Sequence, residues 1–144
     1  MSKACGACLG RREFLAKSAM FAAAAAALSA CGIVDSTSPQ LTESVDITVS
    51  DYAALNNVGG IALVTAGGER LAIVRTGASS YVALSRVCPH QGSTVNTSGS
   101  GFRCPEHGAT FNSTGTWTGG ERTSNMHAYS TSFNASTGVL TVSP

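Results

Sequence analysis

Two short stretches of this sequence each combine a cysteine with a histidine. The first reads CPHQGS and spaces Cys88 and His90 as Cys-x-His, and the second reads CPEHGA and spaces Cys104 and His107 as Cys-x-x-His. Thiolate sulfur and imidazole nitrogen are both protein ligands for iron and zinc. The chain contains only five cysteines and three histidines, so this clustering indicates that the two stretches act together on one group.

Each stretch also carries a proline and a glycine. Pro89 and Pro105 directly follow the cysteines, and Gly92 and Gly108 come shortly after the histidines. Proline stiffens a turn and removes a backbone donor, while glycine permits tight loops and close backbone approach. We therefore expect two loops that bind one shared group between them.

Three kinds of site use such residues. A disulfide between Cys88 and Cys104 suits an exported protein, but it gives the histidines no role. Structural zinc takes two cysteines and two histidines, although its usual pairs are Cys with Cys and His with His. A two-iron cluster, with the cysteines on one iron and the histidines on the other, gives all four residues a role.

At this point the sequence resembles a known family. CPH and CPEHG, preceded by YVALSRV, are similar to the motifs of the Rieske 2Fe–2S proteins, and the likeness runs from about residue 45 to the end of the chain. The resemblance implies one 2Fe–2S cluster. It also implies that Cys88 and Cys104 hold the inner iron, while His90 and His107 hold the outer iron near solvent.

This ligand set affects the reduction potential. Neutral imidazoles in place of two thiolates leave the oxidised cluster neutral, whereas four thiolates would leave it negative, so an electron enters more easily. Rieske centres span about −150 to +300 mV, against about −400 mV for plant-type four-cysteine clusters.

The sequence departs from the Rieske subunits of quinol-oxidising cytochrome bc complexes. Those subunits usually join the two loops by a disulfide, but Ser93 and Glu106 occupy the two positions here. They also usually carry a serine and a tyrosine that hydrogen-bond the cluster sulfurs, where this chain has Ala109 and Phe111. Their third loop is proline-rich, whereas WTGGERT has no proline. We therefore predict a potential in the lower part of the family range, below about +200 mV.

The elements around these loops read as short β-strands. Apolar runs (VDITV, GIALVTA, RLAIVRT, YVALSRV) alternate with turn signals (NNVGG, AGG, TGASS), and GGER is typical of a hairpin turn. Further strand-like stretches are GATFNSTG, HAYSTSFN and GVLTVS. We expect about ten short strands in an all-β antiparallel sandwich or barrel, and the resemblance adds a two-loop cluster-binding subdomain.

Two other residues receive plainer interpretations. His127 is expected to be a strand residue and not a ligand. Trp117 is either a partly buried aromatic residue or part of a loop that covers the cluster and helps a partner to dock.

The first thirty residues read as an export signal. Arg11 and Arg12 precede an apolar, alanine-rich run and the small-residue stretch LSAC, which is the layout of a secretory signal. RREFLAK resembles a twin-arginine signal and LSAC a lipobox, so the mature chain would begin at a lipidated Cys31. An uncleaved signal anchor is the alternative. Residues 31–42 are then a tether and residues 43–144 the Rieske domain, on the periplasmic side or outer face of a bacterial membrane.

The net charge after the expected signal bears on which kind of partner the protein binds. From residue 31 onward there are five arginines, no lysine and seven acidic residues, a net charge of −2, which does not indicate nucleic-acid binding. We expect a membrane-tethered one-electron carrier with no catalytic site of its own, whose partner is a redox protein such as a cytochrome or a quinol-oxidising membrane complex. The alternatives are the iron–sulfur subunit of a cytochrome bc-type quinol oxidoreductase and a zinc-stapled structural lipoprotein.

Overall fold

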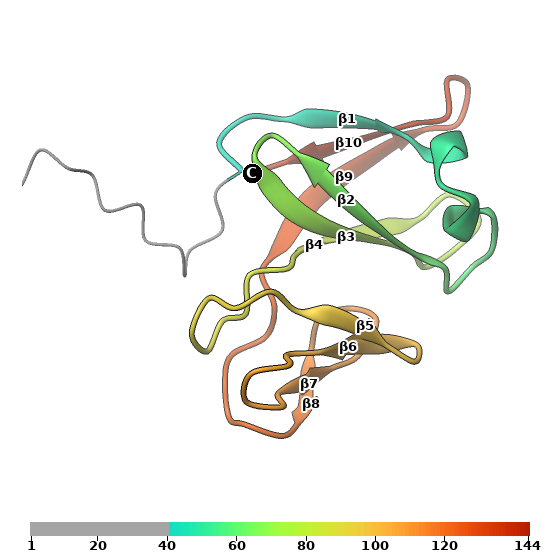
Figure 1. Ribbon diagram of the computed structural model, residues 1–144. Coiled ribbons are helices and arrows are strands. Elements are labelled where there is room, and N and C mark those ends of the chain that lie inside the picture. Colours follow the sequence, from blue (N-terminus) through green and yellow to red (C-terminus); the bar gives the residue numbers. More distant parts are fainter. Residues whose placement is uncertain (1–40) are drawn as a thin grey trace, which may run out of the picture. The chain divides into compact units, whose positions relative to one another are not determined.

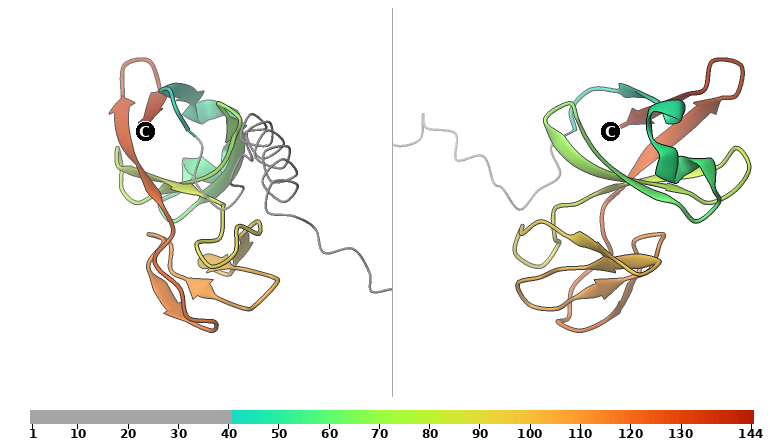
Figure 2. Two further views of the ribbon diagram at one scale, coloured as in Figure 1. Left: turned by 90° about the vertical axis from the view of Figure 1, so that its left-hand side faces the viewer. Right: turned by 45° about the vertical axis from the view of Figure 1, so that its right-hand side comes forward.

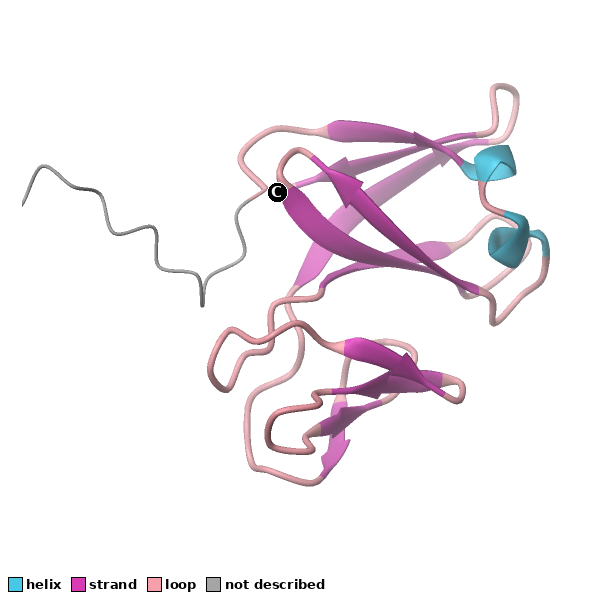
Figure 3. Ribbon diagram, in the orientation of Figure 1, coloured by secondary structure: helices cyan, strands magenta, loops and turns pink. Residues whose placement is uncertain are grey.

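The computed structural model of the chain describes residues 41–144, which form strands joined by turns and two short 3₁₀ helices (Figures 1 and 3). The elements in chain order are β1 (Val45–Thr48), η2 (Val49–Asp51), η3 (Ala53–Asn56), β2 (Ile61–Ala66), β3 (Glu69–Arg75), β4 (Tyr81–Ser85), β5 (Asn96–Ser98), β6 (Gly101–Arg103), β7 (Thr110–Phe111), β8 (Trp117–Gly119), β9 (Ala128–Asn134) and β10 (Val139–Ser143). The prediction of an all-β fold with about ten short strands is confirmed for this part of the chain.

Six of the strands form one antiparallel sheet in the order β1-β10-β9-β4-β3-β2. Gly67 and Gly68, with φ of 59° and 78°, make the tight turn between β2 and β3, as the GGER motif predicts. A Cβ placed on Gly67 would lie 2.7 Å from Leu41 Cδ1 and 3.0 Å from Val45 Cγ1. The β2–β3 turn therefore packs against the start of β1, and the sheet curls into a nearly closed barrel (Figure 2).

The strands β3 and β4 have both faces buried. Leu71 and Ile73 of β3 face the barrel interior, whereas the alternate residues Ala72 and Val74 belong to a second hydrophobic core. Side chains alternate between the two faces of a strand, so a strand covered on both faces reads as a continuous apolar run. This explains the sequences RLAIVRT and YVALSRV.

The second core lies under a smaller antiparallel sheet, inserted between β4 and β9, with the order β5-β6-β7-β8. Phe102 of β6 and Phe111 of β7 pack there with Leu84 of β4. The sequence pattern does not predict β5, β6 or β8, because NTS, GFR and WTG are short and show no apolar alternation. The two motifs with cysteine and histidine lie in the connection from β4 to β5 and in the connection from β6 to β7.

The expected signal, the lipobox and the tether up to residue 40 lie outside the described residues. Within residues 41–144, no helix has the length and apolar character needed to cross a membrane.

Candidate metal centre

Residues 88–93 (the first loop) and 104–109 (the second loop) close with the same backbone hydrogen bonds. In the first loop, Cys88 N–H donates to Ser93 O at 2.8 Å, and Gly92 N–H donates to Cys88 O at 2.8 Å. In the second loop, the equivalent bonds join Cys104 N–H to Ala109 O at 2.8 Å and Gly108 N–H to Cys104 O at 3.0 Å. The two loops are therefore copies of one backbone design.

A glycine at the fifth position makes this design possible. Gly92 and Gly108 have φ of 75° and 76°, a left-handed conformation that costs other residues roughly 1–2 kcal/mol. The repeat appears in the sequence as CPxxGx, but it is weak at that level. Only three of six positions are shared, and the histidine stands third in one copy and fourth in the other.

Buried groups fix the strand that leads into the first loop. Val87 pairs with Thr94 across the loop, and Val87 N–H donates to the Ser85 hydroxyl at 3.1 Å. Ser85 in turn donates to the buried carboxylate of Glu69. The second loop is instead the connection between β6 and β7, in which Arg103 pairs with Thr110.

The two cysteines lie together in the protein interior. Cys88 and Cys104 are fully buried and are not joined by a disulfide. Burial raises the pKa of the Cys88 thiol and contact with Cys104 raises it further, against the opposite effect of the His90 backbone N–H. Burial acts to raise the pKa of Cys104 too, but hydrogen bonds from the Ser93 hydroxyl, the Cys88 thiol and the backbone of the second loop lower it. Backbone and hydroxyl donors thus already favour thiolate charge at Cys104.

The two histidines form a second pair nearer the surface. His90 is half-buried and His107 is exposed. Their Nδ1 atoms are 3.3 Å apart, and the rings meet edge to face with centroids 4.8 Å apart. When both Nδ1 atoms are unprotonated, one iron ion would accept a lone pair from each.

The four donors are therefore arranged as a sulfur pair and a nitrogen pair. Within the described part of the chain, no group of three or more His, Cys, Asp or Glu side chains is placed to hold one metal ion. Structural zinc takes its four donors around a single point. A cluster with two cysteines on one iron and two histidines on the other requires two pairs, and the residues present fit that group.

Comparison with protein-family models identifies the family. The family model for the Rieske [2Fe-2S] domain matches residues 47–130. The chain belongs to the Rieske family. Its cofactor is accordingly a Rieske 2Fe–2S cluster, and the predicted membership of the Rieske family is confirmed.

Solved structures show the same fold. The plasma-membrane Rieske protein PetC3 of the cyanobacterium Synechocystis PCC 6803 is 24% identical, with a TM-score of 0.56 over 69% of this chain and 99% of that one. A chain of a hyperthermophilic respiratory Complex III is 18% identical, with a TM-score of 0.52 over 88% and 93%. The quaternary ammonium Rieske monooxygenase CntA is 19% identical, with a TM-score of 0.57, over 72% of this chain but only 32% of that one. No curated protein sequence matches the chain.

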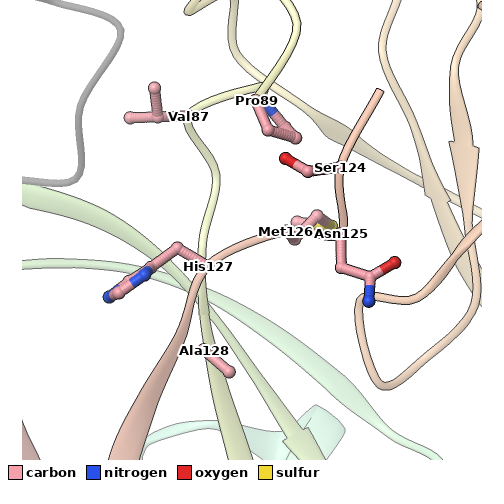
Figure 4. Close-up of a pocket in the computed structure, with 7 residues that line it drawn as sticks. All are labelled: Val87, Pro89, Ser124, Asn125, Met126, His127 and Ala128. Atoms are coloured by element: carbon pink, nitrogen blue, oxygen red, sulfur yellow. The ribbon is translucent and has the colours of Figure 1, made fainter. Parts of the chain in front are cut away.

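His127 lies outside both donor pairs. Ser85 N–H donates to its carbonyl at 2.9 Å, so it extends the pairing of β4 with β9, and its ring stands edge-on to Tyr129 at 4.7 Å. It also lines a pocket of about 530 Å³ beside Pro89, and its ring extends away from Pro89 (Figure 4). The structure thus places His127 one residue before β9, so the prediction of a strand residue is off by one position.

Trp117 is a partly buried residue at the start of β8. It packs against the second core, and its indole N–H donates to the Glu121 carbonyl at 3.0 Å. Trp117 is therefore the partly buried aromatic residue that one of the two interpretations predicted.

One hydrogen-bond donor at the site is not evident from the sequence. In the sequence Ser93 only marks the place of an absent cysteine, but its hydroxyl lies 2.9 Å from Cys104 Sγ. Ala109 and Phe111 are buried residues without a side-chain donor, as expected. Glu106 is exposed.

Proposed function

We propose that this Rieske protein is a one-electron carrier outside the cytoplasm, tied to a membrane by lipid at Cys31. Family membership and fold support electron transfer as its function. The observation that carries the proposal is the ordering of the donors, with fully buried sulfurs behind and nitrogens toward solvent. We assign Cys88 and Cys104 to the inner iron and His90 and His107 to the outer iron.

The residues have distinct roles in this mechanism. The cluster, when bound, supplies the one-electron chemistry. Backbone N–H groups of both loops stabilise the negative charge of the cysteine sulfurs. Burial keeps water from the sulfurs. The exposed ring of His107 gives a partner its shortest approach, so we infer that a cytochrome or a quinol-oxidising membrane complex docks over the two histidines.

A reductive titration of the purified full-length protein tests the carrier function. We expect uptake of one electron per chain, together with a rhombic EPR signal of low average g. A zinc protein would take up no electron and give no signal, and this result would refute the proposal.

The cofactor supports the twin-arginine assignment, because an exported protein that acquires iron and sulfide in the cytoplasm must cross the membrane folded. Replacing Arg11 and Arg12 with Lys is expected to leave cluster-loaded precursor inside the cell, as measured by fractionation and EPR. Normal export of apo-protein would contradict this assignment.

Lipid attachment is tested separately at Cys31. We expect radiolabelled palmitate to be incorporated by the unaltered chain but not by Cys31→Ala, and the altered protein to appear in the soluble fraction. Membrane retention of Cys31→Ala would favour the uncleaved signal anchor.

A further inference from the structure

The side chain of Ser93 links the two loops. Its hydroxyl reaches from the first loop to within 2.9 Å of Cys104 Sγ in the second. Its carbonyl oxygen accepts the N–H of Cys88 at 2.8 Å. One residue therefore contacts both cysteines, through its backbone on one side and its hydroxyl on the other.

Iron ligation fixes the direction of the side-chain bond. A cysteine bound to iron is a thiolate and has no proton to give, so its sulfur acts only as an acceptor. The Ser93 hydroxyl must then donate. A hydrogen bond to a charged acceptor is stronger than one between neutral groups, and the half-burial of Ser93 protects it from competition by water.

The other cysteine has no such partner. Ala109 occupies the position in the second loop that Ser93 occupies in the first, and it offers no donor to Cys88. Within residues 41–144, Ser93 is the one side chain besides the cysteines themselves that hydrogen-bonds either sulfur. The hydrogen bonding of the two thiolates is therefore asymmetric.

We propose that Ser93 is a positioning residue that raises the reduction potential of the cluster by donating a hydrogen bond to Cys104, and that the same bond holds the loops together in place of a disulfide. The proposal rests on the ligand role assigned to Cys104 above. Added electron density strengthens a hydrogen bond to the ligand sulfur, so the bond stabilises the reduced state more than the oxidised state.

The test compares Ser93→Ala with Ser93→Thr, which keeps the hydroxyl, in full-length protein loaded with its cluster. At a fixed ambient potential, Ser93→Ala is expected to lower the ratio of reduced to oxidised protein about threefold to tenfold, the size of an ordinary net hydrogen-bond contribution. That change converts to roughly 30–60 mV, at about 59 mV per tenfold for one electron. Ser93→Thr should remain near the unaltered value.

A neighbouring hydroxyl supplies the matched control. Thr94 bonds to the Arg70 guanidinium and not to a cysteine, so Thr94→Ala should leave the ratio unchanged. Resonance Raman spectra in D₂O give a second readout, because the isotope shift of the iron–sulfur stretching bands should shrink in Ser93→Ala and persist in Ser93→Thr.

The outcomes separate this inference from the proposed function. If the unaltered protein carries no cluster, the proposed function fails before any variant is compared. If it carries one and Ser93→Ala keeps both its potential and its isotope shift, the role of Ser93 is overturned. If Ser93→Ala cannot retain the cluster, Ser93→Thr decides: a loaded protein with the unaltered potential supports the hydroxyl, and loss of the cluster contradicts it.

Discussion

The first and second loops have the same backbone but different side chains. Both close by the same two hydrogen bonds around a glycine with positive φ. They differ in the place of the histidine and in the sixth residue, which is Ser93 in one and Ala109 in the other. The shared backbone therefore gives the two loops the same conformation. The few side chains that differ determine how exposed each histidine is and which cysteine sulfur receives a hydroxyl donor.

The largest effect is expected when either loop loses its cysteine. Cys88→Ser and Cys104→Ser should each abolish cluster binding, because a buried hydroxyl replaces the thiolate that holds the inner iron. We expect visible absorbance and EPR signals to fall to background in both variants. His127→Ala should retain the full signal, since its ring packs on Tyr129 and not on the site. A variant of either cysteine with a normal Rieske spectrum would contradict the equal roles of the loops.

A smaller loss of stability is expected when the glycine with positive φ in either loop is replaced. Gly92→Ala and Gly108→Ala place a side chain at φ of 75° and 76°, so each should cost about 1–2 kcal/mol of folding free energy. Thermal unfolding measures this loss, and cluster release should accompany it in both loops alike. Gly138→Ala, at φ of 69° in a distant turn, should lower stability similarly without releasing the cluster. Release from one loop variant alone would show that the copies are not equivalent.

A hydroxyl in the second loop would make the two copies more alike. In Ala109→Ser, the equivalent position should bring a donor to Cys88 as Ser93 brings one to Cys104. We expect the ratio of reduced to oxidised protein at fixed potential to rise about threefold, in line with a net hydrogen bond. A spectroelectrochemical titration measures it, and a fall in the ratio would argue against the loop equivalence.

The smallest expected effect comes from the exposed carboxylate of the second loop. Glu106→Gln removes a negative charge beside the site and should raise the reduction potential slightly. The gain should shrink as salt is added, because the Debye length falls from roughly 30 Å at 0.01 M salt to about 10 Å at 0.1 M. Potentials measured at both salt concentrations check this. A salt-independent change would indicate a structural role for Glu106.

Much of the fold follows from local patterns. The apolar runs and the GGER turn located the barrel strands within a residue or two, because alternation and turn chemistry act over short range. Three strands of the small sheet, β5, β6 and β8, were missed, because each is only three residues long and their position depends on packing of Phe102 and Phe111 against the barrel.

The site was predictable in its residue types but not in its contacts. The spacing of scarce cysteines and histidines pointed to two paired half-sites, and the structure brings each pair together. The Ser93 bond to Cys104 could not be foreseen, because it crosses between loops whose relative placement only the folded chain defines.

We propose that two copies of one loop hold a Rieske cluster through a sulfur pair and a nitrogen pair. Pulsed EPR of the reduced full-length protein, grown with ¹⁵N-labelled histidine, tests it most directly. We expect couplings from two histidine nitrogens, both retained in His127→Ala and changed in His90→Ala and His107→Ala. A reduced iron–sulfur signal without histidine coupling, or no signal at all, would contradict it.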